Sequence, residues 1–245
     1  MDKELQNKLS WLILIVATIT FVTGLALYSN SQPNTDKLTA VTPSTPSKQD
    51  KQETIATSSK PDNSELLKRL NTIYGTNNSY NAIGAKKPKV TIVEFGDFTC
   101  IHSRASYPII RSLALKYQDR VQLIFRDRTP SEKSVGLALA AHCAGEQNQF
   151  WTMHDLLYQN QSDGLGQDEA SILALAQNIE LDQVQFKNCL DTRKYLNTIK
   201  KNMVDSERLA VPGTPSWYVN GLEYPSGELD KDTFEAYLLN LLDTK

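Results

Sequence analysis

A strand-like segment that runs directly into a cysteine and then into a helical pattern is the strongest constraint on the fold of this chain. Residues 90–98 are rich in valine, isoleucine and phenylalanine, a composition that favours a buried strand. A turn is expected at Gly96 and Asp97. From Ile101 onward the apolar residues recur at the spacing of one helix face. The sequence therefore predicts a strand, a short turn, and a helix that begins immediately after Cys100.

The position of Cys100 is favourable for a reactive thiol. The first N–H groups of a helix have no backbone partner, and they lie at the positive end of the helix dipole. Both effects stabilise a thiolate, which is the nucleophilic form of cysteine. A protonated His102 would add a positive charge nearby. The alternative is that Cys100 is a small buried apolar residue, which is the usual role of an isolated cysteine.

The N-terminal region contains an apolar segment long enough to cross a membrane. Residues 11–28 carry no charge, Lys3 and Lys8 precede them, and the next basic residue is Lys37. This asymmetry favours a cytoplasmic location for residues 1–10. A cleaved signal peptide is the alternative, but the segment is long for one and no small-x-small cleavage site closes it. We therefore expect a single-pass signal anchor in the cell membrane, with the C-terminal domain outside the cytoplasm.

Composition divides the rest of the chain into a linker and a folded domain. Residues 29–63 consist mainly of Ser, Thr, Pro, Gln, Lys and Asn, too few of them apolar to offset the entropy of ordering. We predict a disordered linker there and a folded domain over residues 64–245. The net charge of −2, without a basic stripe that carries aromatic residues, argues against a nucleic-acid partner. The three cysteines are too far apart for a zinc site and no nucleotide-binding loop is seen, so neither a metal nor a cofactor is expected.

The patterns after Cys100 predict alternating elements that are interrupted by a helical region. Residues 120–126 alternate like a second strand, and the order strand, helix, strand implies a parallel pair. Further helices are expected at 132–146, 150–158, 168–179, 181–190 and 193–209, then strands at 216–221 and 222–224 and a helix at 230–242. A short helix is expected to begin at Ser64, and residues 75–84 are predicted to form turns. The predicted order is β-α-β, a helical insertion over about 131–209, and β-β-α.

Several separated motifs resemble those of the DsbA-type thiol–disulfide oxidoreductases, an α/β family with a thioredoxin fold and a helical insertion. The matching stretches are residues 90–98 with Cys100-Ile101-His102-Ser103, Cys143-Ala144-Gly145-Glu146-Gln147 with Phe150-Trp151 and His154-Asp155, and Gly213-Thr214-Pro215. The resemblance implies that Cys100 attacks substrate disulfides. It also implies that Thr214-Pro215 is a cis peptide beside this cysteine, where it holds an extended substrate. The implied partners are cysteine-containing secreted or membrane proteins.

The chain departs from this family at Ser103. The family pattern has a second cysteine there, and its thiol resolves the mixed disulfide that the first cysteine forms. Serine cannot form a disulfide, although its hydroxyl could stabilise a Cys100 thiolate through a hydrogen bond. The chain therefore cannot carry an oxidising disulfide at this site. It can act as a monothiol catalyst if a small-molecule thiol, a substrate cysteine or a membrane redox partner resolves the intermediate.

Three alternatives to a natural monothiol catalyst stay open at this point. In the first, the protein has lost catalysis and binds extended chains beside the Pro215 loop, as a chaperone would. In the second, Ser103 is a deliberate replacement for cysteine, of the kind that traps mixed disulfides. In the third, the domain conjugates a small thiol cofactor, since relatives of this fold bind glutathione.

Cys143 and Cys189 require separate consideration. Each lies in a predicted helix among apolar residues, and two such cysteines in an oxidising compartment are expected to pair. We predict a structural disulfide that clamps the helical insertion, and the alternative is two free buried thiols. This pairing would leave Cys100 as the odd thiol, which suits a reactive role.

Three further titratable residues, Glu94, His142 and His154, are considered for a role in the site. Glu94 lies on the first strand and points to the side opposite Phe95, so it is a candidate proton acceptor for the active cysteine. Members of this broad fold use an acid there. His142 and His154 lie in predicted helices without carboxylate or cysteine partners at metal-binding spacing. We expect both histidines to be ordinary helix residues.

Overall fold

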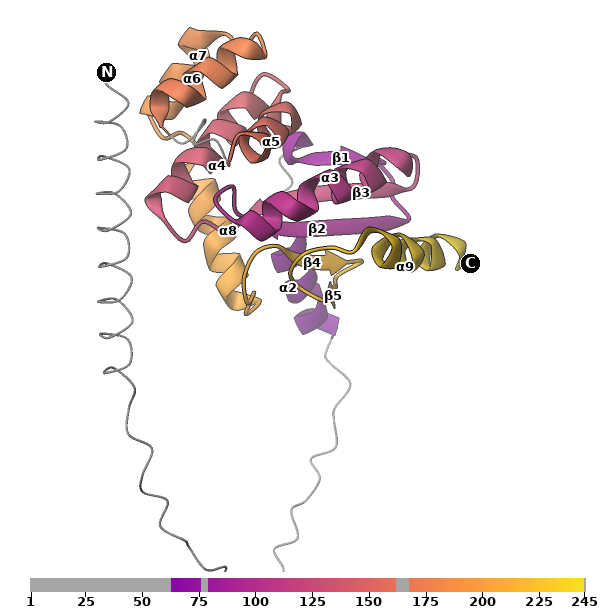
Figure 1. Cartoon of the computed structure of the whole chain (residues 1–245). Coiled ribbons are helices and arrows are strands. Elements are labelled where there is room, and N and C mark those ends of the chain that lie inside the picture. The colour runs from indigo at the N-terminus through magenta and orange to yellow at the C-terminus, as the bar shows by residue number, and fades with distance from the viewer. Residues whose placement is uncertain (1–62, 76–78, 162–167, 245) are drawn as a thin grey trace, which may run out of the picture. The chain divides into compact units, whose positions relative to one another are not determined.

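The computed structural model describes residues 63–75, 79–161 and 168–244, all of which belong to the compact unit Ser58–Lys245 (Figure 1). The predicted anchor at residues 11–28 lies outside the described residues, as does nearly all of the predicted linker. Among the helices that are described, none is both long enough and apolar enough to cross a membrane.

A five-stranded sheet forms the centre of this unit (Figure 1). Its strands are β1 (Ala82–Gly84), β2 (Val90–Gly96), β3 (Val121–Asp127), β4 (Ser216–Val219) and β5 (Leu222–Tyr224), in the spatial order β1-β3-β2-β4-β5. The strands β2 and β3 are parallel, with Val90 opposite Val121, so the predicted parallel pair is confirmed. The other three strand pairs are antiparallel.

The prediction missed β1. It assigned residues 75–84 to turns, but Ser79–Asn81 form a 3-10 helix and Ala82–Gly84 pair antiparallel with β3. Three residues are too few to show the alternation by which a strand is identified. The strand becomes evident only through its partner, because Ile83 lies opposite Leu123.

The helices lie close to their predicted ranges. They are α2 (Asn63–Tyr74), α3 (Ile101–Lys116), α4 (Glu132–Gly145), α5 (Phe150–Gln159), α6 (Glu169–Asn178), α7 (Gln183–Asp191), α8 (Leu196–Arg208) and α9 (Lys231–Asp243). The carboxylates of Asp168, Asp182 and Asp230 cap three of them, each by accepting a bond from the backbone N–H three residues later. The helix expected from Arg193 begins only at Leu196, because the positive φ of Arg193 (47°) lies outside the helical region.

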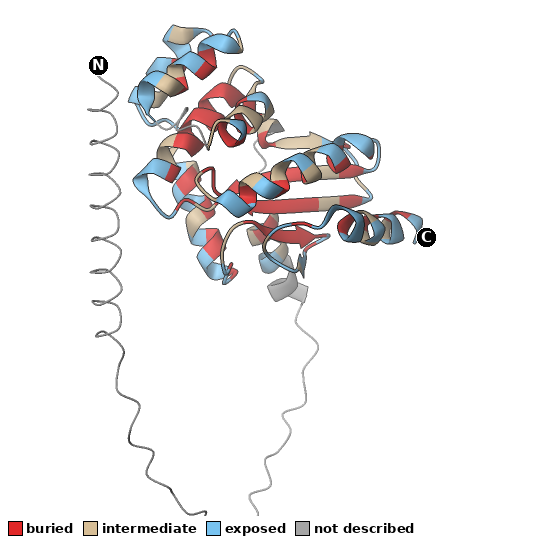
Figure 2. Cartoon of the chain, viewed as in Figure 1, coloured by how far each residue is buried: buried red, intermediate tan, exposed pale blue. Residues whose placement is uncertain are grey.

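Alternate residues of the strands build one core on each face of the sheet. On one face, Ile92 of β2 belongs to a cluster with Leu113 of α3 and Phe234 of α9. On the other face, Val93 belongs to a cluster with Ile73 of α2. This is the two-residue period of a strand. Figure 2 shows the central strands buried and exposed residues along the outer sides of α3 and α9. Both of these helices cover one face of the sheet, and α2 packs on the other face.

The helices α4 to α8 form an insertion between β3 and β4, and the insertion has a hydrophobic core of its own. Phe98 and Phe125 extend this core to the end of the sheet. A disulfide joins Cys143 of α4 to Cys189 of α7, and both residues are buried. The expected pairing is present, and Cys100 is the free cysteine of the chain.

Removal of this disulfide is expected to lower the free energy of unfolding by about 2–4 kcal/mol, because the bond restricts the unfolded chain across a sequence separation of 46. The measurement is chemical denaturation of the Cys143→Ala/Cys189→Ala variant beside the parent chain. The parent chain in a reducing agent is the control, and it should unfold at the denaturant concentration of the variant. A loss of less than about 0.5 kcal/mol would show that the bond is not a stabilising clamp.

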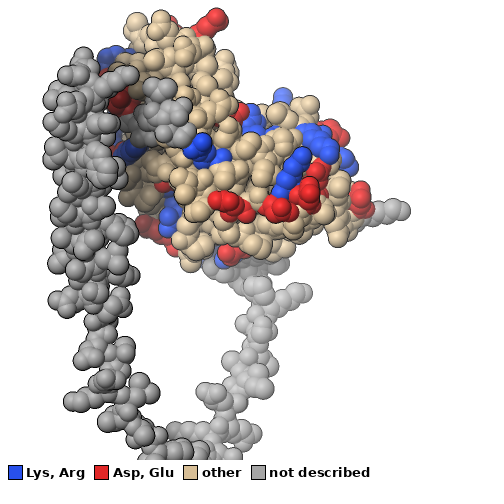
Figure 3. Space-filling model, in the orientation of Figure 1, with Lys and Arg blue, Asp and Glu red and all other residues tan. Residues whose placement is uncertain are grey.

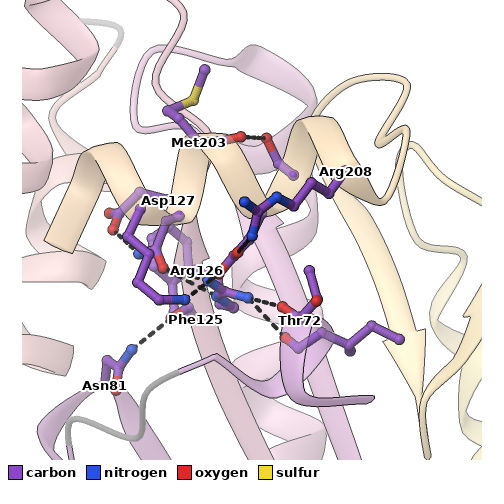
Figure 4. Close-up of polar contacts among 12 residues, drawn as sticks. Thr72, Asn81, Phe125, Arg126, Asp127, Met203 and Arg208 are labelled. Atoms are coloured by element: carbon purple, nitrogen blue, oxygen red, sulfur yellow. Dashed lines mark hydrogen bonds and ion pairs between the residues drawn. The ribbon is translucent and has the colours of Figure 1, made fainter. Parts of the chain in front are cut away.

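A buried polar cluster ties the insertion to β3 and to the end of α2 (Figure 4). Arg126 donates from Nη2 to Asn202 Oδ1 and to Asp205 Oδ2 of α8, both at 2.7 Å. Its Nη1 donates to the carbonyl oxygens of Thr72 and Ile73. The Arg126 and Asp205 side chains are only 2% and 3% exposed. Because a buried charge is tolerated only when it is paired and hydrogen-bonded, the cluster fixes α2 and α8 against the sheet.

Candidate active site

Cys100 is the N-cap residue of α3, where the sequence predicted the helix to begin. Its backbone is extended, and its carbonyl oxygen accepts the first helical bond from Arg104 N at 3.0 Å. The preceding turn is closed by a bond from Cys100 N to Asp97 O, also at 3.0 Å. The Asp97 carboxylate accepts bonds from the backbone N–H and the hydroxyl of Thr99. Cys100 is partly exposed, so an ordered turn presents the residue to solvent at the positive end of a helix.

The peptide bond between Thr214 and Pro215 is cis, and it lies against Cys100. The Cys100 thiol donates a hydrogen bond to the carbonyl oxygen of Thr214, with an Sγ–O distance of 3.1 Å. The register of the sheet accounts for this contact. The strands β4 and β2 are antiparallel with Ser216 opposite Phe95, so the residues before β4 meet the turn that follows β2. The expected cis peptide beside the cysteine is therefore present.

His102 and Ser103 do not bond to the Cys100 sulfur. Ser103 is fully buried, and its Oγ has no hydrogen-bond partner among the described residues, so the expected bond to Cys100 is not formed. His102 is half exposed, and its Nδ1 lies 2.6 Å from Oε1 of Glu228. Glu228 follows 126 positions later in the chain, and nothing in the sequence connected it with this site.

A buried carboxyl group lies on the strand that leads to the active-site turn. Glu94 is fully buried, and neither of its carboxyl oxygens has a hydrogen-bond partner in the described part of the chain. Burial raises the pKa of Glu94 from 4.5 to about 8. Burial, followed by the Glu94 carboxyl, raises the pKa of Tyr158 on α5, and the Tyr158 hydroxyl lies near that of Ser103 without a well-formed bond. Tyr158 therefore lies within electrostatic reach of Glu94, Ser103 and Cys100.

The two insertion histidines lie in helices, His142 in α4 and His154 in α5, as the sequence predicted. Both are fully buried, and each also lies against a carboxylate. His142 Nε2 is 2.8 Å from Asp127 Oδ2, and His142 Nδ1 is 3.1 Å from the hydroxyl of Tyr80. His154 Nδ1 is 2.8 Å from Asp155 Oδ1, and burial lowers the pKa of His154. The described residues contain no group of three His, Cys, Asp or Glu side chains that could hold a metal ion.

A groove beside Cys100 was not predicted. It has a volume of about 510 Å³ and is lined by Ile101, Arg104, Ala105, Tyr107, Pro108 and Gln159. Ile101, the residue directly after Cys100, is 67% exposed although it is apolar. Four of the six lining residues are apolar or aromatic, and Arg104 adds one positive charge. The groove is suited to apolar side chains of an extended partner chain.

The surface near α3 and α9 carries charges of both signs. Figure 3 shows acidic and basic side chains close to one another on this face. Lys116 and Glu235 are one such pair, with 2.6 Å between Nζ and Oε1. Selection of a substrate by charge would therefore depend on individual residues near the cysteine, such as Arg104 and Glu228, rather than on the field of the whole face.

The central sheet with helices on both faces, the helical insertion, and a helix-start cysteine beside a cis proline define a thioredoxin-fold protein of the disulfide-exchange class. The family model described as thioredoxin matches residues 76–239. The chain therefore belongs to the thioredoxin family and, within it, to the DsbA-type thiol–disulfide oxidoreductases.

Two curated relatives show how much of the chain is shared. A probable disulfide bond formation protein D of Bacillus anthracis is 30% identical over 150 residues, which are 57% of this chain and 69% of the relative. A Na(+)/H(+) antiporter, NhaA 1 of Salinispora arenicola, is 32% identical over 143 residues, which are 56% of this chain. The chain spans only 21% of the length of that antiporter.

Solved structures agree with the fold. The thiol-disulfide exchange protein alpha-DsbA2 of Wolbachia pipientis superposes with a TM-score of 0.63 at 21% identity, over 73% of this chain and 94% of that one. A periplasmic thioredoxin-like protein of Salmonella enterica serovar Typhimurium gives a TM-score of 0.57 at 25% identity, over 76% of this chain and all of that one. The predicted α/β fold with a helical insertion is confirmed.

Proposed function

We propose that this protein is a membrane-anchored, extracytoplasmic thiol–disulfide exchange protein that acts on cysteines of secreted or membrane proteins through Cys100 alone. The observation that carries the proposal is the Cys100 sulfur, which lies at the start of α3 and 3.1 Å from the Thr214 carbonyl oxygen. The uncharged segment 11–28 supports membrane anchoring. The Cys143–Cys189 disulfide supports an oxidising compartment.

The exchange needs no second cysteine in the protein. The Cys100 thiolate attacks one sulfur of a substrate disulfide, a new bond forms between Cys100 and that sulfur, and the other substrate sulfur leaves as a thiolate. A thiolate from the substrate or from a small-molecule thiol then attacks the mixed disulfide and releases Cys100. With a substrate thiolate the net reaction is isomerisation, whereas with two outside thiols the substrate is reduced. Ser103 takes no part in the electron transfer.

The residues around Cys100 have distinct tasks in this scheme. Thr214, beside the cis Pro215, offers its carbonyl to a backbone N–H of an extended substrate once the Cys100 proton has left. His102, held by Glu228, places an imidazole two residues after the reacting cysteine. Glu94 is the candidate for proton exchange at this site, because it is a buried and unpaired carboxyl. Burial raises its pKa to about 8, so it can receive the thiol proton above that pH and can donate a proton to a leaving thiolate below it.

The rate of alkylation of Cys100 by iodoacetamide, measured against pH in the full chain, tests this proposal. Cys143 and Cys189 are paired in a disulfide, so Cys100 is the thiol whose alkylation is measured. We expect the rate to reach half its maximum below about pH 7, whereas a free thiol does so near pH 8.5. We also expect the protein to restore activity to a scrambled disulfide-bonded ribonuclease in the presence of a small thiol, and the Cys100→Ala variant to lack this activity.

A half-maximal pH near that of a free thiol, together with no isomerase activity, would contradict the proposal. The protein would then be a binding module on the fold of an enzyme. Chaperone activity that persists in Cys100→Ala would support that interpretation, because it would need no sulfur chemistry.

A further inference from the structure

Gln161 connects the helical insertion to the backbone of the active-site turn. It follows α5, and its own backbone N–H bonds to Tyr158 O at 3.3 Å. Its side-chain Nε2 donates to the carbonyl oxygen of Phe98 at 2.8 Å and to that of Cys100 at 3.1 Å. The amide therefore joins two parts of the fold that are 61 residues apart in the sequence.

The bond to Phe98 meets the need of a buried carbonyl group. Phe98 is 1% exposed and packs in the core of the insertion. A buried carbonyl that loses its donor carries a desolvation cost, so the backbone would shift to recover a partner. Gln161 thereby holds the peptide that enters the active-site turn.

The bond to Cys100 acts at the start of α3. The Cys100 carbonyl and the Ile101 N–H belong to one planar peptide unit, so a donor that fixes this carbonyl also fixes the direction of the first N–H group of the helix. The same oxygen accepts the first helical bond from Arg104 N. Gln161 therefore controls the orientation of the helix end that faces the sulfur.

The other side-chain hydrogen bonds of the active-site turn involve atoms other than the Phe98 and Cys100 carbonyl oxygens. Asp97 bonds the backbone and hydroxyl of Thr99 from within the turn. Ser134 Oγ of α4 lies 3.1 Å from the Thr99 hydroxyl, and Thr214 bonds the Cys100 sulfur. In the described part of the chain, the contact from the insertion to the backbone of the cysteine is that of Gln161.

We infer that Gln161 is a positioning residue for Cys100, through which the helical insertion holds the peptide groups that stabilise the thiolate. The inference deepens the proposed function and rests on it. According to this inference, the helical insertion contributes to the reactivity of Cys100 in addition to its structural role. Gln161 itself need not touch the substrate, because it acts through the backbone on either side of Thr99.

The test compares variants at position 161 with a matched surface glutamine. Gln161→Met keeps an unbranched side chain of similar length without a donor, and Gln161→Glu replaces the donor by a carboxylate that faces two carbonyl oxygens. Gln177→Leu, at an exposed position of α6, is the control. The alkylation rate of Cys100 by iodoacetamide is measured from pH 5 to 10 in each full-length chain, and circular dichroism confirms folding.

We expect both Gln161 variants to raise the half-maximal pH by about one unit, with about tenfold slower alkylation at pH 6 and an unchanged maximal rate. The Gln177→Leu chain should match the parent. Simple loosening of the turn would instead expose the sulfur and speed alkylation at every pH. If Gln161→Met does not fold, Gln161→Glu decides alone.

The outcomes separate this inference from the proposed function. A parent chain with a low half-maximal pH and Gln161 variants with the same profile would overturn the role of Gln161 and leave the function of Cys100 intact. A parent chain whose profile is that of a free thiol would overturn both, since there would be no stabilised thiolate to position.

Discussion

Replacement of Ser103 by cysteine is expected to give the protein a disulfide between Cys100 and the new thiol at position 103, and with it the ability to oxidise substrate thiols. Ser103 lies in the first turn of α3, three residues after the N-cap, which is the spacing of the family's redox pair. In the disulfide-bonded variant a substrate thiolate would attack the Cys100 sulfur and release the thiolate at position 103. A second thiolate of the same substrate would then attack the mixed disulfide, which leaves the substrate oxidised and the enzyme reduced. The measurement is the oxidation of a reduced, unfolded ribonuclease by a stoichiometric amount of the pre-oxidised variant, followed by the loss of free thiols.

Two matched variants make this prediction interpretable. Ser103→Ala tests the serine hydroxyl and should retain the monothiol activity, because Ser103 Oγ does not bond the Cys100 sulfur. Cys100→Ala/Ser103→Cys has the new thiol without the nucleophile and should be inactive. A folded Ser103→Cys chain that forms the disulfide and still oxidises nothing would show that the site no longer accepts substrate.

Replacement of Glu94 by glutamine is expected to remove a large pH dependence of stability. In the unfolded chain this carboxyl loses its proton near pH 4.5, whereas burial in the folded chain raises its pKa to about 8. Between these values the folded state binds more protons than the unfolded state, so the free energy of unfolding of the parent falls as pH rises. The stabilising effect is complete below about pH 4.5 and is lost through pH 8, with a total of about 3–5 kcal/mol.

The measurement for Glu94 is chemical denaturation at pH 5 and at pH 9. Between these two pH values the parent should lose about 3 kcal/mol more than the Glu94→Gln variant. Glu223→Gln, which changes an exposed carboxylate on β5, serves as the control and should follow the parent. Equal pH dependence in the parent and in Glu94→Gln would mean that the carboxyl is already ionised inside the fold.

Features that depend on neighbouring residues could be predicted from the sequence. The strand before Gly96, the helix after Cys100 and the helical insertion follow from apolar periodicity and from residues that begin or end helices. The cis peptide at Pro215 came with the resemblance, because a proline alone is compatible with either isomer. By contrast, the three residues of β1 carried no periodic signal.

Features that depend on long-range contacts could not be predicted. Glu228 reaches His102, and Gln161 reaches Cys100, across 126 and 61 residues. A single sequence does not show which polar side chains meet in the fold. The same limit applies to His142, whose carboxylate partner Asp127 lies on β3 rather than at a helical spacing. Such contacts depend on how sheet and insertion pack together.

The pairing of Cys143 with Cys189 leaves one reactive sulfur in each molecule, and this determines how long a captured substrate stays attached. In an enzyme with two active-site cysteines, the second thiol attacks the mixed disulfide and releases the bound substrate. In the proposed single-cysteine scheme each chain holds one substrate, and the time until release depends on how much thiol the surroundings supply. In a strongly oxidising medium the protein would act as a stoichiometric tether, and in a thiol-rich one as a recycling catalyst.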